Sequence, residues 1–213
     1  IYNDPNKPET YHPEFYYQFP APNEALGPTI CLTNGLTAGG KLDAEKEVSV
    51  AKIVVNEMYK DIIENPSARF FMFEQEDSNN CCQCDACKEA ESVYKRSGIL
   101  IRFCNMLIEE IEKKLESDGV QRNFEIVTFA YSYATEPPVK VVNNEMVPID
   151  STVVANERLC MRLALMHNVK DGAFSSKQRI EIVRALKEWK IIAKKYMLWL
   201  YDADFGDWLS YFP

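Results

Sequence analysis

The chain has 213 residues, a formal net charge of -8, and side chains that are 46% hydrophobic and 12% aromatic. A chain of this length can bury one full-sized core, so we expect residues 1–213 to form a single domain. The acidic balance argues against a nucleic-acid partner, because phosphate binding needs a basic face. No apolar stretch reaches the roughly 18 residues that a membrane span requires.

The first third of the chain predicts an irregular lead-in followed by a strand and a helix. Prolines between positions 5 and 28 and an aromatic cluster at 11–17 predict a structure without regular elements over residues 1–27. Residues 29–33 predict a short buried strand that Asn34-Gly35 closes. Apolar positions recurring at three and four predict an amphipathic helix over 42–64.

The remaining segments alternate between strands and helices. Strands are predicted at 70–73, 124–131 and 196–201, with weaker strand signals at 139–142 and 146–155, and helices at 89–117 and 177–194. The best strands are continuously apolar, which is typical of a parallel sheet covered by helices. The predicted fold class is therefore α/β.

Acids and aromatic residues gather where the predicted strands end. The carboxyl ends of parallel strands are where α/β folds assemble their sites. Exposure of strand ends to water also explains much of this polarity. The residues at the three strand ends are Glu74, Glu76 and Asp77, then Tyr131, Tyr133 and Glu136, then Tyr201, Asp202 and Asp204.

Seven cysteines are present, and four of them lie between positions 81 and 87. A disulfide framework would spread its cysteines along the chain, so this crowding favours metal binding or reduced thiols, and a redox pair is the least favoured reading. Cys82, Cys84 and Cys87 are candidate thiolate ligands of a structural zinc ion. The candidates for a fourth ligand are Cys31, Cys81, Cys104 and His12.

Several short motifs occur in an order that resembles a known family. They are His12-Pro13-Glu14, the Cys-Leu-Thr-Asn run at 31–34, Asp77, Cys82-x-Cys84-x-x-Cys87, Asn105, Tyr131 with Glu136-Pro137-Pro138, Trp189, and Trp199-Leu-Tyr-Asp202. Together they resemble the bacterial domain-of-unknown-function family 4838, which is similar to the barrel domains of α-glucuronidases and β-hexosaminidases.

This resemblance implies a partial, TIM-like β/α barrel, with the chain as an internal fragment of a larger glycoside-hydrolase-like protein. It also implies a carbohydrate ligand and a secreted or cell-surface location, whereas the clustered cysteines favour the cytoplasm. Sheet edges left open by a partial barrel would favour a homo-oligomer.

Hydrolysis of a glycan by general acid–base catalysis needs carboxylates and no cofactor. The expected catalytic residues are Asp77, which the family match favours, Glu76, which acid–base chemistry favours, and Asp202 across the barrel. The expected substrate-binding residues are Tyr131, Glu136, Tyr201 and Trp199. The alternatives are a carbohydrate-binding module without catalysis and a structural, metal-braced domain.

Overall fold

A computed structural model describes residues 30–74, 81–164 and 177–199 of the chain, apart from the side chains of 177–179 and 181. Within these ranges the fold is α/β, as the sequence predicts. It consists of three α-helices, a four-stranded parallel sheet and a separate two-stranded hairpin. None of the described helices is both long and apolar enough to cross a membrane.

The first helix, α1 (Val50–Glu64), begins later than the predicted residue 42. Ser49 caps it, because the Ser49 side chain accepts a hydrogen bond from the Lys52 backbone N–H. Asn65-Pro66 ends it, as the sequence predicts. The buried stripe of α1 consists of Val50, Ala51, Val54, Val55, Met58 and Ile62.

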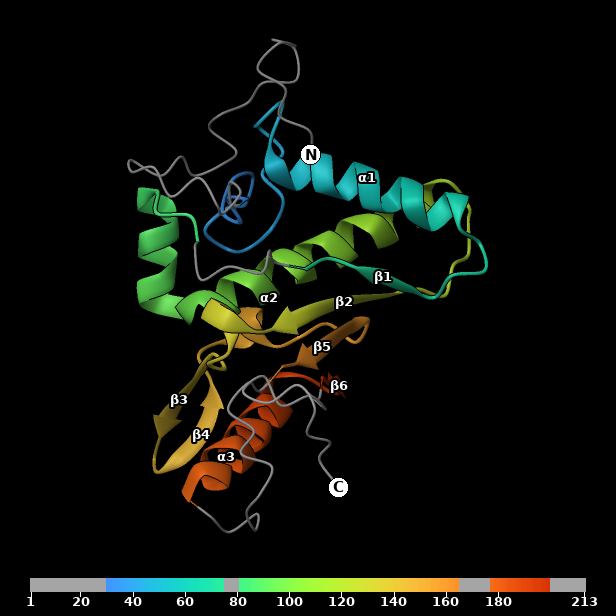
Figure 1. Cartoon of the computed structure of the whole chain (residues 1–213). Coiled ribbons are helices and arrows are strands. Elements are labelled where there is room, and N and C mark those ends of the chain that lie inside the picture. The colour runs from blue at the N-terminus through green and yellow to red at the C-terminus, as the bar shows by residue number, and fades with distance from the viewer. Residues whose placement is uncertain (1–29, 75–80, 165–176, 200–213) are drawn as a thin grey trace, which may run out of the picture.

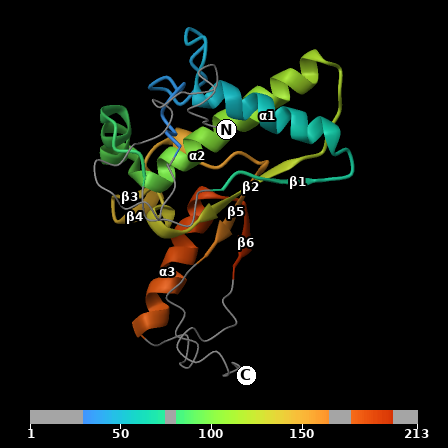
Figure 2. The same cartoon turned by 45° about the horizontal axis from the view of Figure 1, so that its top comes forward.

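The long helix α2 (Asp85–Ser117) contains a sharp bend at Lys95, where φ is 60° and ψ is 170°. Its first turns stand at a steep angle to the remainder, which runs beside α1 (Figures 1 and 2). After the bend the helix is deeply buried, and Phe103 stacks on Phe73 with ring centroids 5.0 Å apart.

The parallel sheet contains β1 (Phe70–Met72), β2 (Glu125–Ala130), β5 (Leu159–Leu163) and β6 (Lys195–Leu198). Its spatial order, β1-β2-β5-β6, is also the order along the chain. The register pairs Phe71 with Ile126 and Val127 with Cys160. β1 and β6 are the edges of this sheet within the described residues, so the sheet is open and does not close into a barrel there.

Two predicted features differ from the structure in the segments around these strands. Residues 32–35 form a turn, and of the strand expected at 29–33 the described part keeps only a β-bridge at Ile30. The weak signals near 139–155 become an antiparallel hairpin, β3 (Val139–Val142) with β4 (Glu145–Pro148), and a short 3-10 turn. The last helix, α3 (Lys177–Ile192), lies close to its predicted range.

The two faces of the parallel sheet carry different residues, because side chains alternate along a strand. One face, which we call the helix-covered face, joins the main hydrophobic core with α1, α2 and α3. Its residues include Phe71, Ile126, Ala130, Leu159, Met161 and Leu163. By register, the opposite face carries Met72, Glu125, Val127, Phe129, Cys160, Arg162 and Lys195.

Side chains on the opposite face reach across an intervening strand. Lys195 of β6 donates to Glu125 of β2 at 3.0 Å, past β5. At the other end, Arg162 of β5 donates to Glu74, just after β1, at 2.9 Å and past β2. Strands two apart are separated by about 10 Å, so these long side chains span the sheet along its width.

Candidate functional site

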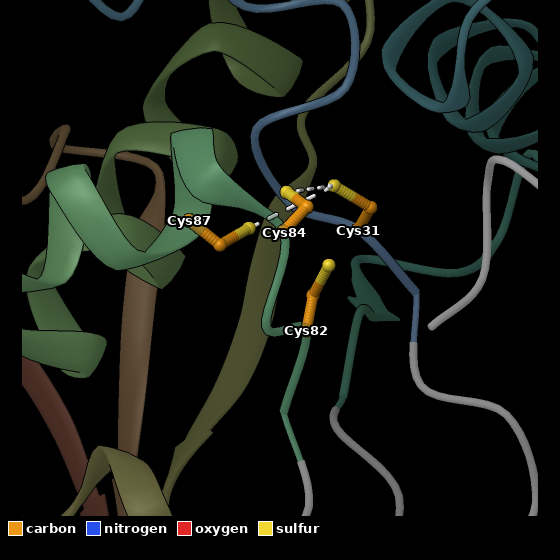
Figure 3. Close-up of side chains that lie close together, drawn as sticks. All are labelled: Cys31, Cys82, Cys84 and Cys87. Carbon is orange, nitrogen blue, oxygen red and sulfur yellow. Dashed lines mark hydrogen bonds between the residues drawn. The ribbon is translucent and has the colours of Figure 1, made fainter. Parts of the chain in front are cut away.

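Four cysteines from two distant parts of the chain meet beside the first turn of α2 (Figure 3). Cys31 comes from the loop before α1, Cys82 and Cys84 come from the segment before α2, and Cys87 lies in the first turn of α2. The four Sγ atoms all lie within 4.8 Å of one another.

Local structure explains how the Cys31 loop is held. Asn34 accepts a hydrogen bond from the Val50 N–H through its side chain, so the loop is tied to the start of α1. Gly35, at φ +92°, lies so close to Ser49 that a Cβ atom would meet its hydroxyl at 2.3 Å. Cys31 is therefore fixed to the body of the domain, and Cys84 and Cys87 project together because they are three residues apart around the start of a helix.

The spacing of the sulfur atoms matches a tetrahedral metal site. Cys31 Sγ lies 3.7 Å from Cys84 Sγ and 3.7 Å from Cys87 Sγ. Tetrahedral zinc with Zn–S bonds of about 2.3 Å places its sulfur ligands about 3.8 Å apart. All seven cysteines are free, and the bond in a disulfide would be much shorter, at about 2.05 Å. The four sulfurs are thus close enough together to contact one ion.

The environment of the cluster favours a thiolate at Cys31. Hydrogen bonds from the thiols of Cys82 and Cys87 lower the pKa of Cys31 far below its ordinary value, even though burial opposes ionisation. The same sharing raises the pKa of Cys82 to about 12, because its proton is engaged by Cys31. The hydroxyl of Thr33, 3.1 Å from Cys87 Sγ, adds a further polar contact. Thiolate is the form in which cysteine binds metals.

The structure therefore brings the three sequence-predicted ligands together, and among the described candidates for the fourth it places Cys31 with them. Cys81 stands outside the group, and Cys104 is fully buried in the main core. His12 lies outside the described residues.

A second group of side chains lies at the carboxyl end of the sheet, on the opposite face. The Arg162 guanidinium lies over the Phe129 ring at 4.8 Å and over the Trp199 ring at 5.4 Å, and it pairs with Glu74. Phe129 meets Trp199 edge-on at 5.5 Å and Tyr131 at 6.1 Å between ring centroids. We call Glu74, Phe129, Tyr131, Arg162 and Trp199 the sheet-edge cluster. The name refers to the edge formed by the carboxyl ends of the strands and not to the outer strands β1 and β6.

The sheet-edge cluster is accessible. The side chains of Arg162 and Glu74 are 20% and 27% exposed, and Trp199 is 44% exposed. Burial raises the pKa of the Glu74 carboxyl, and the nearby Arg162 charge counteracts only part of that rise. A cation, a carboxyl group and an aromatic ring are thus partly exposed together.

The other predicted site residues have three outcomes. Tyr131 and Trp199 are brought together around Phe129, while Glu136 lies elsewhere, paired with Lys95 at 2.6 Å and with its side chain 74% exposed. Glu76, Asp77, Tyr201 and Asp202 lie outside the described residues. Their roles stay predictions.

Sequence reasoning missed Phe129 and Arg162 as site residues, and it missed strand β5 altogether. Arg162 stands among apolar residues in the run Leu159-Cys-Met-Arg-Leu163. A lone arginine inside a short apolar run is a usable signal, because a buried strand rarely carries an unpaired cation.

The fold and these two groups define an α/β protein with a parallel sheet in chain order and a four-cysteine cluster. The profile of the family described as "Domain of unknown function (DUF4838)" matches residues 2–213. The chain belongs to this family. Searches of curated proteins and of solved structures found no match.

Proposed function

We propose that this chain is a carbohydrate-binding wall of a glycoside-hydrolase-like barrel, braced by a structural zinc ion. The barrel part of the proposal is supported by the strand order, since adjacent parallel strands in chain order are the arrangement of a (β/α)₈ barrel. In such a barrel, alternate strands also supply each layer of interior side chains. The contacts from Glu125 to Lys195 and from Glu74 to Arg162 have that alternate-strand pattern.

The observation that carries the carbohydrate proposal is the sheet-edge cluster. Phe129, Tyr131 and Trp199 offer aromatic faces against which the apolar side of a sugar ring packs. Arg162 supplies several N–H donors, and Glu74 supplies acceptors, for sugar hydroxyls. The cluster lies at the end of the sheet where barrel enzymes bind their substrates.

Hydrolysis would need two carboxylates, one to protonate the leaving oxygen and one to act as nucleophile or base. Glu76 and Asp77 follow Glu74 after a single glutamine, and Asp202 follows Trp199 by three residues, so all three are near the sheet-edge cluster in sequence. We propose Asp77 and Glu76 as the acid and its partner and Asp202 as a further carboxylate. Tyr131, Tyr201 and Trp199 are the proposed substrate contacts; Glu136 is left out because it pairs with Lys95 away from the cluster.

A glycan array probed with the purified chain, followed by calorimetry with the oligosaccharide that binds, tests the carbohydrate proposal. Trp199→Ala should abolish binding, while Tyr196→Ala, which removes an equally exposed aromatic ring of β6 outside the cluster, should preserve it. The Glu76→Gln, Asp77→Asn double variant then separates an enzyme from a binding module. Hydrolysis should vanish with binding retained, and failure of the wild type to hydrolyse any bound glycan would support binding alone.

The zinc proposal rests on the mutual spacing of the four sulfurs. A zinc ion held by Cys31, Cys82, Cys84 and Cys87 would have four protein ligands, which is typical of structural rather than catalytic sites. Elemental analysis after purification under reducing conditions should find one zinc per chain. Cys31→Ser should lose the ion and Cys81→Ser should keep it, and a metal-free wild type would contradict the proposal.

We also propose that a second copy of the chain covers the open sheet edges. Apolar side chains at both edge strands are partly exposed, including Phe70 at 47% and Leu198 at 51%. Within the described residues no further strand pairs with β1 or β6 on its outer side, and an edge of this kind favours association. Light scattering should therefore report a dimer or larger species, and a monodisperse monomer would contradict this part of the proposal.

A further inference from the structure

We infer that metal bound by the four cysteines folds the first ten residues of α2, and that losing the metal releases this segment while the remaining domain stays folded. We call residues 85–94 the arm. The inference rests on the proposed zinc site and adds a way in which that site would be regulated. Three independent features of the arm support it.

The first feature is burial. Cys87 is the only buried residue of the arm, whereas the part of α2 beyond the bend supplies many residues to the main core. Cys31, Cys82 and Cys87 form a small buried cluster of their own, separate from that core. Isolated helices as short as the arm are not stable in water, so the arm depends on what its cysteine contacts.

The second feature is a cavity between the arm and the body of the domain. It has a volume of about 330 Å³ and is lined by Ala90 and Val93 of the arm, by Leu36 and Ala38 of the loop that follows Cys31, and by Arg102. This partly open groove separates the middle of the arm from the body of the domain, and Val93 beside it is 50% exposed. Apolar packing along the length of the arm is therefore sparse.

The third feature is the bend itself. Lys95 has a φ of 60° with a ψ of 170°, a backbone conformation that only glycine adopts without strain. Its ammonium group contacts Glu136 at 2.6 Å and the Pro137 carbonyl at 3.1 Å. These exposed polar contacts are weak. Strain at Lys95 thus favours release once the cysteines no longer hold the arm.

The other contacts of the arm leave the metal as its main attachment to the body of the domain. Tyr94 stacks on the Arg102 guanidinium at 3.8 Å, and Glu91 pairs with Arg96 at 2.6 Å. Both lie next to the bend, so neither fixes the start of the arm. Cys31, anchored to α1 through Asn34, would connect to Cys84 and Cys87 through the ion. Metal binding and ordering of the arm would then be one event.

Hydrogen–deuterium exchange on the full chain in reducing buffer, with one equivalent of zinc and after chelation by EDTA, tests this inference. Amides of the arm should lose protection by about 100-fold on chelation, while those of 97–117 should change by less than about threefold. Cys87→Ser with zinc present should resemble the chelated wild type. Cys81→Ser, a neighbouring thiol outside the cluster, should behave as the zinc-bound wild type.

The outcomes separate the two proposals. A chain that binds no zinc contradicts the proposed zinc site. A chain that binds one zinc but keeps the arm protected after chelation overturns this inference alone. Loss of protection throughout the domain on chelation also overturns it, because the metal would then support the whole fold and not the arm.

Discussion

The two ends of the sheet's opposite face carry the same kind of contact in different surroundings. At the amino end, Glu125 accepts from Arg69 at 2.5 Å and from Lys195 at 3.0 Å, and its side chain is only 6% exposed. At the carboxyl end, Glu74 pairs with a single cation, Arg162, and the Glu74 side chain is 27% exposed, several times more than that of Glu125.

This difference separates a stabilising contact from a binding one. Glu125 pairs with two cations and is buried, so it is not accessible to a ligand. The sheet-edge cluster keeps donor groups of Arg162, carboxylate oxygens of Glu74 and the ring of Trp199 partly exposed. The pKa values follow this difference: the pKa of the paired Glu125 carboxyl is lowered, and the pKa of the Glu74 carboxyl is raised. The same pair of residue types thus has a structural role at one end and is available for a ligand at the other.

The largest effect is expected at the amino end. Glu125→Gln removes a buried carboxylate that accepts two charged hydrogen bonds, so the free energy of unfolding should fall by about 2–3 kcal/mol. Urea denaturation measures this loss. The control is Glu157→Gln, since Glu157 pairs with Lys194 at 2.8 Å but is 82% exposed. The free energy of unfolding of this variant should not differ measurably from that of the wild type. Equal losses in the two variants would contradict the comparison.

Acid should remove the contribution of Glu125. Burial raises the pKa of Glu125, but hydrogen bonds and charges from Arg69 and Lys195 outweigh burial and leave the pKa below its usual value. A lowered folded-state pKa stabilises the fold fully above the unfolded value of about 4.3, and this stability is lost as pH falls through the folded value. The difference in unfolding free energy between wild type and Glu125→Gln should therefore shrink below about pH 4. A difference that stays constant from pH 7 to pH 3 would exclude this account.

Arg162→Lys tests the carboxyl end. Lysine keeps the charge but loses the planar guanidinium that lies over Phe129 and Trp199 and donates in a fixed geometry. Affinity for the glycan found on the array should fall about tenfold, which is about 1.4 kcal/mol, with unfolding free energy changed by less than about 1 kcal/mol. Arg184→Lys, on the exposed surface of α3, should change neither. A stability loss without an affinity loss would make Arg162 structural.

Much of the fold was predictable from the sequence because the pattern of apolar residues indicates most of its helices and strands. α1, α2, β1, β2 and α3 were found because each is long or strongly apolar. The strand β5 was missed because its five residues include Arg162, whose charge is tolerated only through partners on other strands. The prediction of a strand over 29–33 was wrong. Cys31 is buried because it packs in the cysteine cluster, and a turn begins at the next residue.

The site was predictable only where its residues are close in sequence. Cys82, Cys84 and Cys87 could be grouped by spacing, whereas Cys31 could only be one of several candidates, since the loop that delivers it is positioned by Asn34 and α1. Phe129 and Arg162 meet through the register of β2 and β5, which pairs them directly. Register depends on how the sheet assembles and is not written in either segment alone.

The smallest effect on the free energy of unfolding is expected for Glu74→Gln. The sign of this effect is informative because it should be opposite to that for Glu125→Gln. Burial raises the pKa of Glu74 and Arg162 opposes that rise in part. A raised folded-state pKa favours the fold below the unfolded value of about 4.3 and loses that advantage as pH rises through the folded value, opposite to Glu125. At pH 7, Glu74→Gln should therefore leave the unfolding free energy unchanged or slightly raised, by less than about 0.5 kcal/mol because water screens the site.

Carbon-13 NMR titration of the glutamate carboxyls should place the pKa of Glu74 above the ordinary value of about 4.3 and that of Glu125 below it, with Arg162→Met raising the pKa of Glu74 further. The reverse order would show that charge, and not burial, dominates at the sheet edge, and would remove the distinction between the two ends.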